Sequence, residues 1–180
     1  MAETYEFSKE DLEQIEKIKA KYPEVQPAVM PVLWLAQEKF GHVDSDVQKL
    51  VADTLGLPRA HVHGVATFYT QYYKERMGKY VLDVCGSFSC QVCGAQDIIN
   101  YLEEKLGIKE GETTEDGMFS IREVECLGAC GYAPMLQVTN DKYVNYLTKE
   151  KIDKLIEDLR AGKEPEFESM PVVYNQTSDS

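Results

Sequence analysis

The sequence lacks the features of a membrane or secreted protein. In its 180 residues, no apolar run approaches the roughly 18–20 residues that a membrane-spanning helix needs. The first residues, MAETYEFSKEDLEQ, hold neither a basic nor an apolar segment, so we expect no secretory signal unless one was removed before this numbering. We therefore expect a cytoplasmic protein without direct membrane insertion, in a reducing compartment where disulfides are rare.

Positive charge is also scarce. The chain has 19 Lys and Arg against 31 Asp and Glu, a formal net charge of −12. An acidic protein is repelled by nucleic acids and by anionic membrane surfaces, which excludes both as main partners. We interpret the acidic excess as a solvated surface. The chain contains neither a G-x-G-x-x-G motif nor a P-loop, so it shows no nucleotide site and no catalytic residues of its own.

The first half, residues 1–77, has apolar residues at helical spacing and is predicted to be a helical domain. Four short helices with one apolar face each should pack as a bundle. We expect the fourth helix, with Tyr69, Tyr72 and Tyr73, to pack against the sheet that follows; the alternative is that these tyrosines face a partner subunit. The residues that limit these helices are Ser8 with Asp11 in a capping box, Gly41, Asp44 or Ser45, Gly56 and Pro58.

After Gly78 the pattern changes to strands and helices. KYVLDVC and FSIREVE are typical of strands, and MLQVTN and KYVNYL of a hairpin. AQDIINYLEEKLG indicates a helix, and Thr148 should cap a last one. We predict an α+β fold: an N-terminal helical bundle, a thioredoxin-like β-α-β-β-α domain over 78–160, and a loose tail over 161–180.

All five cysteines lie in two short loops. Cys85 and Cys126 each end a predicted strand, so both loops can leave the same end of one sheet. Converging thiolates repel one another unless a metal centre neutralises them, and iron–sulfur clusters and zinc are the usual solutions. The glycines in both loops favour an iron–sulfur cluster, because they let backbone N–H groups approach sulfur. The three histidines lie outside both loops, which argues against a Rieske-type centre. Structural zinc stays an alternative.

Cys93 leaves the pairing ambiguous. Cys85, Cys90 and Cys93 together have the C-x4-C-x2-C spacing of plant-type ferredoxins, and Cys90 with Cys93 could form a thiol–disulfide pair at a helix N-terminus. Either use would leave one cysteine of the second loop without a role. We therefore interpret Cys93 as a free thiol in the first turn of the following helix.

The spacing C-x4-C-x35-C-x3-C, ending in CLGACGYAP, resembles the thioredoxin-like [2Fe–2S] ferredoxin family, which includes the 24 kDa subunit of NADH–quinone oxidoreductase (respiratory complex I). The stretches GVATFYTQY and GIKEGETTEDGMFSI also resemble that family. The resemblance implies that one [2Fe–2S] cluster is bound by Cys85, Cys90, Cys126 and Cys130.

The resemblance further implies a one-electron carrier beside a flavoprotein subunit that binds FMN and NADH. It would lie in the cytoplasmic, peripheral arm of an inner-membrane complex, with the helical half docked on the flavoprotein. The same resemblance implies a cis peptide bond before Pro134. A corresponding subunit of an NAD-linked hydrogenase or formate dehydrogenase stays open as an alternative.

Overall fold

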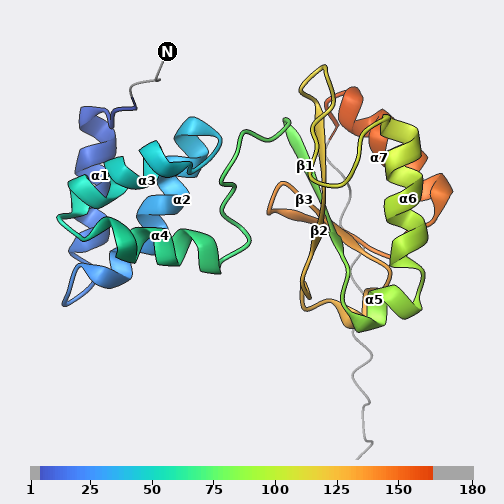
Figure 1. Cartoon of the computed structure of the whole chain (residues 1–180), viewed down its shortest axis with the longest axis horizontal. Helices are drawn as coiled ribbons and strands as arrows, with labels where there is room; N and C mark the ends of the chain where they lie inside the picture. Colours follow the sequence, from blue (N-terminus) through green and yellow to red (C-terminus); the bar gives the residue numbers. More distant parts are fainter. Residues whose placement is uncertain (1–4, 164–180) are drawn as a thin grey trace, which may run out of the picture. The chain divides into compact units, whose positions relative to one another are not determined.

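A computed structural model describes residues 5–163, which form two compact units divided between Met77 and Gly78 (Figure 1). Each unit has its own core, and each is described by itself below. Within the described range, no helix has the length and apolar character needed to cross a bilayer. The predicted tail begins at residue 161, and its larger part, 164–180, lies outside the described residues.

The first unit is the predicted set of four helices. Local capping chemistry sets their limits: Ser8 and Asp11 form the reciprocal capping box, and Asp44 accepts hydrogen bonds from the first turn of the third helix. Gly41 and Gly56 end their helices in the left-handed conformation that favours glycine. The helices are α1 (Lys9–Lys19), α2 (Val29–Phe40), α3 (Ser45–Leu55) and α4 (Arg59–Phe68), with a 3-10 turn at Gln26–Ala28.

Tyr72 corrects one expectation about this unit. It is buried in the core of the helical unit, where its hydroxyl donates to the Met30 carbonyl at 2.9 Å. Its ring also makes an edge contact with Trp34, at 6.3 Å between centroids. The expectation that this side chain packs on the sheet is therefore wrong. A tyrosine that follows a helix can fold back onto the same bundle, and sequence spacing does not distinguish the two cases.

The second unit is built on a mixed sheet of four strands, in the order β2-β1-β3-β4. The first two strands are parallel, and the other neighbouring pairs are antiparallel. A parallel pair needs a crossover connection, which the α6 helix provides (Figure 1). The elements are β1 (Tyr80–Cys85), α5 (Phe88–Val92), α6 (Ala95–Leu106), β2 (Phe119–Val124), a 3-10 turn (Cys130–Tyr132), β3 (Leu136–Val138), β4 (Lys142–Val144) and α7 (Lys149–Arg160).

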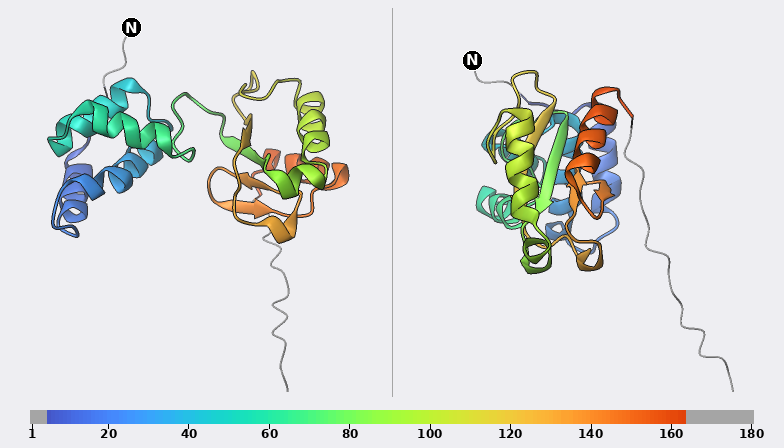
Figure 2. Two further views of the ribbon diagram at one scale, coloured as in Figure 1. Left: turned by 60° about the horizontal axis from the view of Figure 1, so that its bottom comes forward. Right: turned by 90° about the vertical axis from the view of Figure 1, so that its right-hand side faces the viewer.

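One face of the sheet forms the core with two helices. Figure 2 shows α6 and α7 side by side on this face. Leu82 and Val84 of β1 point into it, together with Ile121 of β2, and all three are fully buried. Alternation along a strand then places Asp83 and Cys85 on the opposite face of the sheet. The predicted α+β, thioredoxin-like layout is confirmed, and α5 is an additional short helix.

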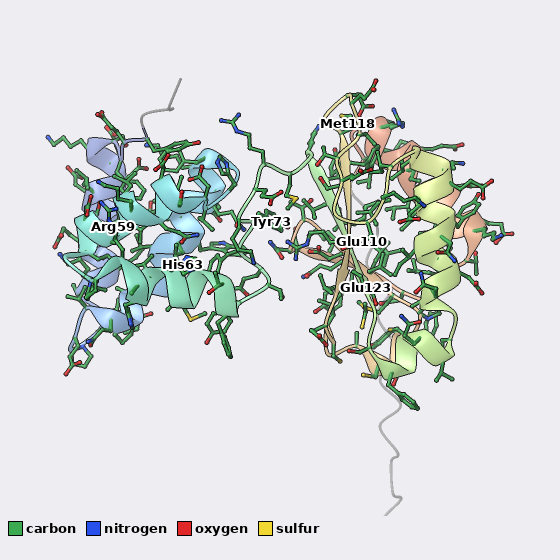
Figure 3. The ribbon with its side chains drawn as sticks, viewed as in Figure 1. Arg59, His63, Tyr73, Glu110, Met118 and Glu123 are labelled. Atoms are coloured by element: carbon green, nitrogen blue, oxygen red, sulfur yellow. The ribbon has the colours of Figure 1, made fainter. Side chains whose placement is uncertain are left out.

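The free edge of β2 is covered by the polar loop that precedes it. The Gly111 N–H donates to the Ile121 carbonyl at 2.8 Å, and the Ile121 N–H donates to the Glu112 carbonyl at 3.3 Å. The Glu123 N–H donates to the Glu110 carboxylate, and Figure 3 shows these two residues near each other. Pairing of the edge in this way restrains β2 up to the residues where the second cysteine loop starts.

A buried ion pair joins the two parallel strands. Asp83 and Arg122 are register partners, and the Arg122 Nε lies 2.9 Å from the Asp83 Oδ1. Only 2% of Asp83 is exposed. Burial raises the pKa of the Asp83 carboxyl to about 6, although the positive charge of Arg122 acts to lower this pKa. A carboxylate this deep in the protein depends on its cation, because water does not reach it.

We predict that Arg122→Gln lowers the free energy of unfolding of the second unit by about 3 kcal/mol, because it leaves a buried carboxylate without its counter-charge. Urea unfolding followed by circular dichroism measures this loss. Trp34, the only tryptophan, reports separately on the first unit by its fluorescence.

The double variant Asp83→Asn/Arg122→Gln is the matched control, because it replaces the ion pair by a neutral pair. It should recover most of the lost stability. A single variant as stable as the unaltered chain, or a double variant no better than the single, would contradict this account of the pair.

Candidate metal centre

Parallel pairing brings the two cysteine loops to one end of the sheet. Cys85, the last residue of β1, is the register partner of Val124, the last residue of β2. Both loops therefore start at the same end of the sheet. This confirms the expectation that the two loops emerge together. Figure 2 shows α5 of the first loop and the 3-10 turn of the second loop at this common end.

The first loop turns the two cysteines of its C-x4-C motif inward. Cys85 and Cys90 are 3% and 2% exposed, and they form a small buried cluster with Ala95 and Met135. Gly86 follows Cys85 directly, and a Cβ on it would collide with the Glu123 carboxylate. The exposed Glu123 side chain lies against this glycine and would have to move to make room for a side chain next to the first cysteine.

Cys93 does not lie where the sequence pattern placed it. It follows the last turn of the short helix α5, is exposed, and precedes Gly94 and the start of α6. The expectation that it occupies the first turn of the longer helix is wrong, because α5 ends before α6 begins. A helix of five residues is too short to show a periodic apolar pattern, so no sequence signal pointed to it.

The second loop is more open. Cys126 and Cys130 are exposed, and their Sγ atoms lie 3.6 Å apart. Gly128 adopts a left-handed conformation, with φ of 78°, and its N–H donates to the Cys126 Sγ at 3.4 Å. The Tyr143 hydroxyl donates to the Leu127 carbonyl at 2.8 Å, which fixes this loop to β4. The peptide bond before Pro134 is cis, as the family resemblance implied.

The sulfur atoms of the two loops interact with one another. Burial raises the pKa of Cys90 to about 11, and the neighbouring Cys85 thiol adds to the rise. The Gly128 N–H, with smaller contributions from Cys130 and Cys85, lowers the pKa of Cys126. Hydrogen bonding and charge from Cys126 raise the pKa of Cys130. The structure thus brings together Cys85, Cys90, Cys126 and Cys130.

The exposed Cys93 lies outside this set of sulfur contacts in the described part of the chain. Among residues 5–163, no group of three or more His, Cys, Asp and Glu side chains is arranged to hold a single metal ion. His42 is buried in the helical unit, beside the Phe40 carbonyl and Asp44, and His63 contacts Gln48. These two histidines thus have structural contacts within the first unit.

The residues at this end of the sheet fit a [2Fe–2S] cluster. Four thiols converge in two pairs, one pair from each loop, and such a cluster takes one pair of cysteines at each iron. The Gly128 N–H already points at a sulfur, and the Met135 backbone hydrogen-bonds Cys90. Apolar side chains, including Leu127 and Ala133, pack around the buried cysteines. Hydrogen-bond donors to sulfur and apolar surroundings are the features that tune the reduction potential of such clusters.

Comparison with known proteins agrees with this arrangement. The thioredoxin-like [2Fe–2S] ferredoxin family matches residues 15–160. The chain is 43% identical over 151 residues to an NADH-quinone oxidoreductase subunit of Rhizobium meliloti, covering 84% of this chain and 89% of that protein. It is 40% identical over 159 residues to NADH-quinone oxidoreductase subunit 2 of Thermus thermophilus, covering 87% and 88%.

A solved structure has the same fold. A chain in the crystal structure of NAD+-reducing [NiFe]-hydrogenase in the air-oxidized state superposes with a TM-score of 0.61. The identity is 21%, over 72% of this chain and 23% of that chain, so this likeness concerns the fold alone. The family match covers both units described above, and the two relatives match over nearly their whole length. The chain belongs to the thioredoxin-like [2Fe–2S] ferredoxin family.

Proposed function

We propose that Cys85, Cys90, Cys126 and Cys130 hold one [2Fe–2S] cluster, and that the chain is the electron-carrying subunit of an NADH–quinone oxidoreductase. The observation that carries the proposal is that the two cysteine pairs meet. The Cys126 and Cys130 Sγ atoms lie 3.6 Å apart, and the buried cluster with Cys85 and Cys90 packs against Leu127 and Ala129 of the second loop. Two relatives that bear the name of this oxidoreductase match most of the chain at 40% and 43% identity, which supports the assignment to that complex.

Residues of the chain itself stabilise negative charge at the site. When bound, the [2Fe–2S] group supplies a one-electron redox centre, whose sulfurs become more negative on reduction. The Gly128 N–H stabilises negative charge on the Cys126 sulfur, and the Met135 backbone does the same at Cys90. The buried first pair excludes water from one side, and the exposed second pair leaves the other side open to a redox partner.

The partner that fits this site is a flavoprotein subunit that binds FMN and NADH. The chain has no nucleotide-binding motif of its own, so the electron must come from a neighbouring subunit. We propose that the helical unit docks on this flavoprotein, in the cytoplasmic, peripheral arm of the complex. The likeness to the hydrogenase chain supports only a shared fold, and the more similar relatives favour the quinone-reducing complex.

The ligand set can be tested with two alanine variants, Cys130→Ala and Cys93→Ala. We predict that Cys130→Ala loses most of its bound iron and visible absorption, because one iron lacks a ligand. Cys93→Ala should keep both, since it replaces an exposed thiol outside the sulfur contacts. Iron analysis and the visible and EPR spectra measure the outcome, and circular dichroism checks that both variants are folded.

The reverse result would show that the ligand set is wrong: a bleached Cys93→Ala beside a coloured Cys130→Ala. A colourless unaltered chain that holds zinc would instead support the structural-zinc alternative, because zinc gives neither a visible spectrum nor an EPR signal.

We predict that the full chain co-elutes with an FMN-binding subunit of an NADH–quinone oxidoreductase in size-exclusion chromatography, and that NADH oxidation with an artificial acceptor requires that subunit. The chain alone should oxidise no NADH, because it lacks a nucleotide site. An unrelated protein of similar negative charge serves as the control and should elute separately. NADH oxidation by the isolated chain, or separate elution from the flavoprotein, would contradict the proposed role.

A further inference from the structure

The helix α4 turns only a narrow side toward the core of the helical unit. Its buried residues are Val62 and Ala66, and Val65 is half-buried. The residues of the opposite side recur at steps of three and four positions, so they share one face of the helix. This α4 face consists of Ala60, His61, Gly64, Thr67 and Phe68, and all five residues are exposed. Within the described residues, one long side of α4 therefore lies open.

The α4 face carries no charge when histidine is neutral. Arg59, at the first position, is the one charged residue of the helix. By contrast, α1, α3, α6 and α7 each expose several charged side chains. The Phe68 ring is 77% exposed, and its centroid lies 4.9 Å from that of the Tyr69 ring. An uncharged, exposed face that ends in an aromatic pair is the kind of surface that partner proteins cover.

The chain itself gives no reason for a glycine at position 64. Glycine in the interior of a helix lowers the stability of the helix relative to alanine. Apart from the backbone of the same helix and the two adjacent residues, nothing in the described part of the chain lies within 4 Å of the place of a Gly64 Cβ. Gly78 shows the opposite case, since a Cβ there would lie 2.8 Å from the Phe119 backbone. Packing within the chain thus requires Gly78 and does not require Gly64.

We propose that the α4 face is the surface by which the helical unit docks on the flavoprotein subunit. The inference rests on the proposed function and names the docking surface. A backbone segment of the flavoprotein lies against Gly64, where no Cβ keeps it away, and the Phe68 ring fills an apolar recess beside that segment. The partner surface is therefore uncharged and apolar where it meets α4.

The charge of the chain decides between this partner and a second copy. Each copy has a formal net charge of −12, and the α4 face holds no positive charge that would offset the repulsion between two copies. A flavoprotein surface without a matching negative charge meets no such repulsion. The α4 face therefore suits a different protein better than it suits a second copy of this chain.

The test measures how the full chain and three variants bind the FMN-containing flavoprotein subunit, by biolayer interferometry. Gly64→Ala adds a methyl group to the face, and Phe68→Ala removes the ring. Leu12→Ala is the matched control, because Leu12 is a 44% exposed apolar residue of α1 in the same unit. Trp34 fluorescence during heating gives the thermal midpoint of the helical unit for each variant.

We expect Gly64→Ala to weaken binding about tenfold and yet to raise the thermal midpoint of the helical unit by about 4 °C. The methyl group favours the helix in the free chain but collides with the docked backbone. Phe68→Ala should weaken binding about thirtyfold with little change in the midpoint, because the ring is exposed in the free chain. Leu12→Ala should bind as the unaltered chain does.

Unchanged binding by Gly64→Ala or by Phe68→Ala would overturn the inference, and so would an equal loss in Leu12→Ala. An unaltered chain that self-associates, beside a monomeric Phe68→Ala, would assign the α4 face to a second copy and would also overturn it. These results leave the proposed function intact when the unaltered chain still binds the flavoprotein. An unaltered chain that does not bind the flavoprotein would overturn the proposed function, and this inference with it.

Discussion

The parallel pairing of β1 with β2 is the constraint on which the cysteine site depends. Neighbouring parallel strands finish at the same end of a sheet. The register that pairs Cys85 with Val124 therefore also brings the two cysteine loops together. An antiparallel pair in the same positions would send the second loop to the other end of the sheet. The helix α6 makes the parallel connection, and its apolar face is buried against the same strands.

The residues around the site bring the four cysteine sulfurs close together, although their thiolate forms repel one another. Cys90 resists ionisation because it is buried, whereas Cys126 ionises more readily because a backbone N–H faces its sulfur. Four thiolates at this place need a positively charged centre among them. The Asp83–Arg122 pair joins the two parallel strands that lead into the loops, so the two strands are linked just before the loops begin.

Much of the fold was predictable because its signals are local. The capping box at Ser8, the N-cap at Thr148 and the glycine stop at Gly56 each depend on a few neighbouring residues, and each is present. The meeting of the two loops was predictable as well, since each of their first cysteines ends or follows a strand.

Other features depend on contacts that a single sequence does not display. The helix α5 is too short to show a period, which is why Cys93 was placed one helix too late. Tyr72 packs into the helical bundle because the chain after α4 folds back onto it. The spacing of residues in the sequence does not reveal this.

The central claim is that the two loops close around one inorganic core with two irons. X-ray absorption at the iron edge of the purified, oxidised chain tests this most directly, because it reports the atoms around each iron. The account predicts that each iron has only sulfur neighbours, cysteine and sulfide, together with one second iron at bonding distance. An iron site with nitrogen or oxygen ligands, or with no second iron beside it, would contradict the account.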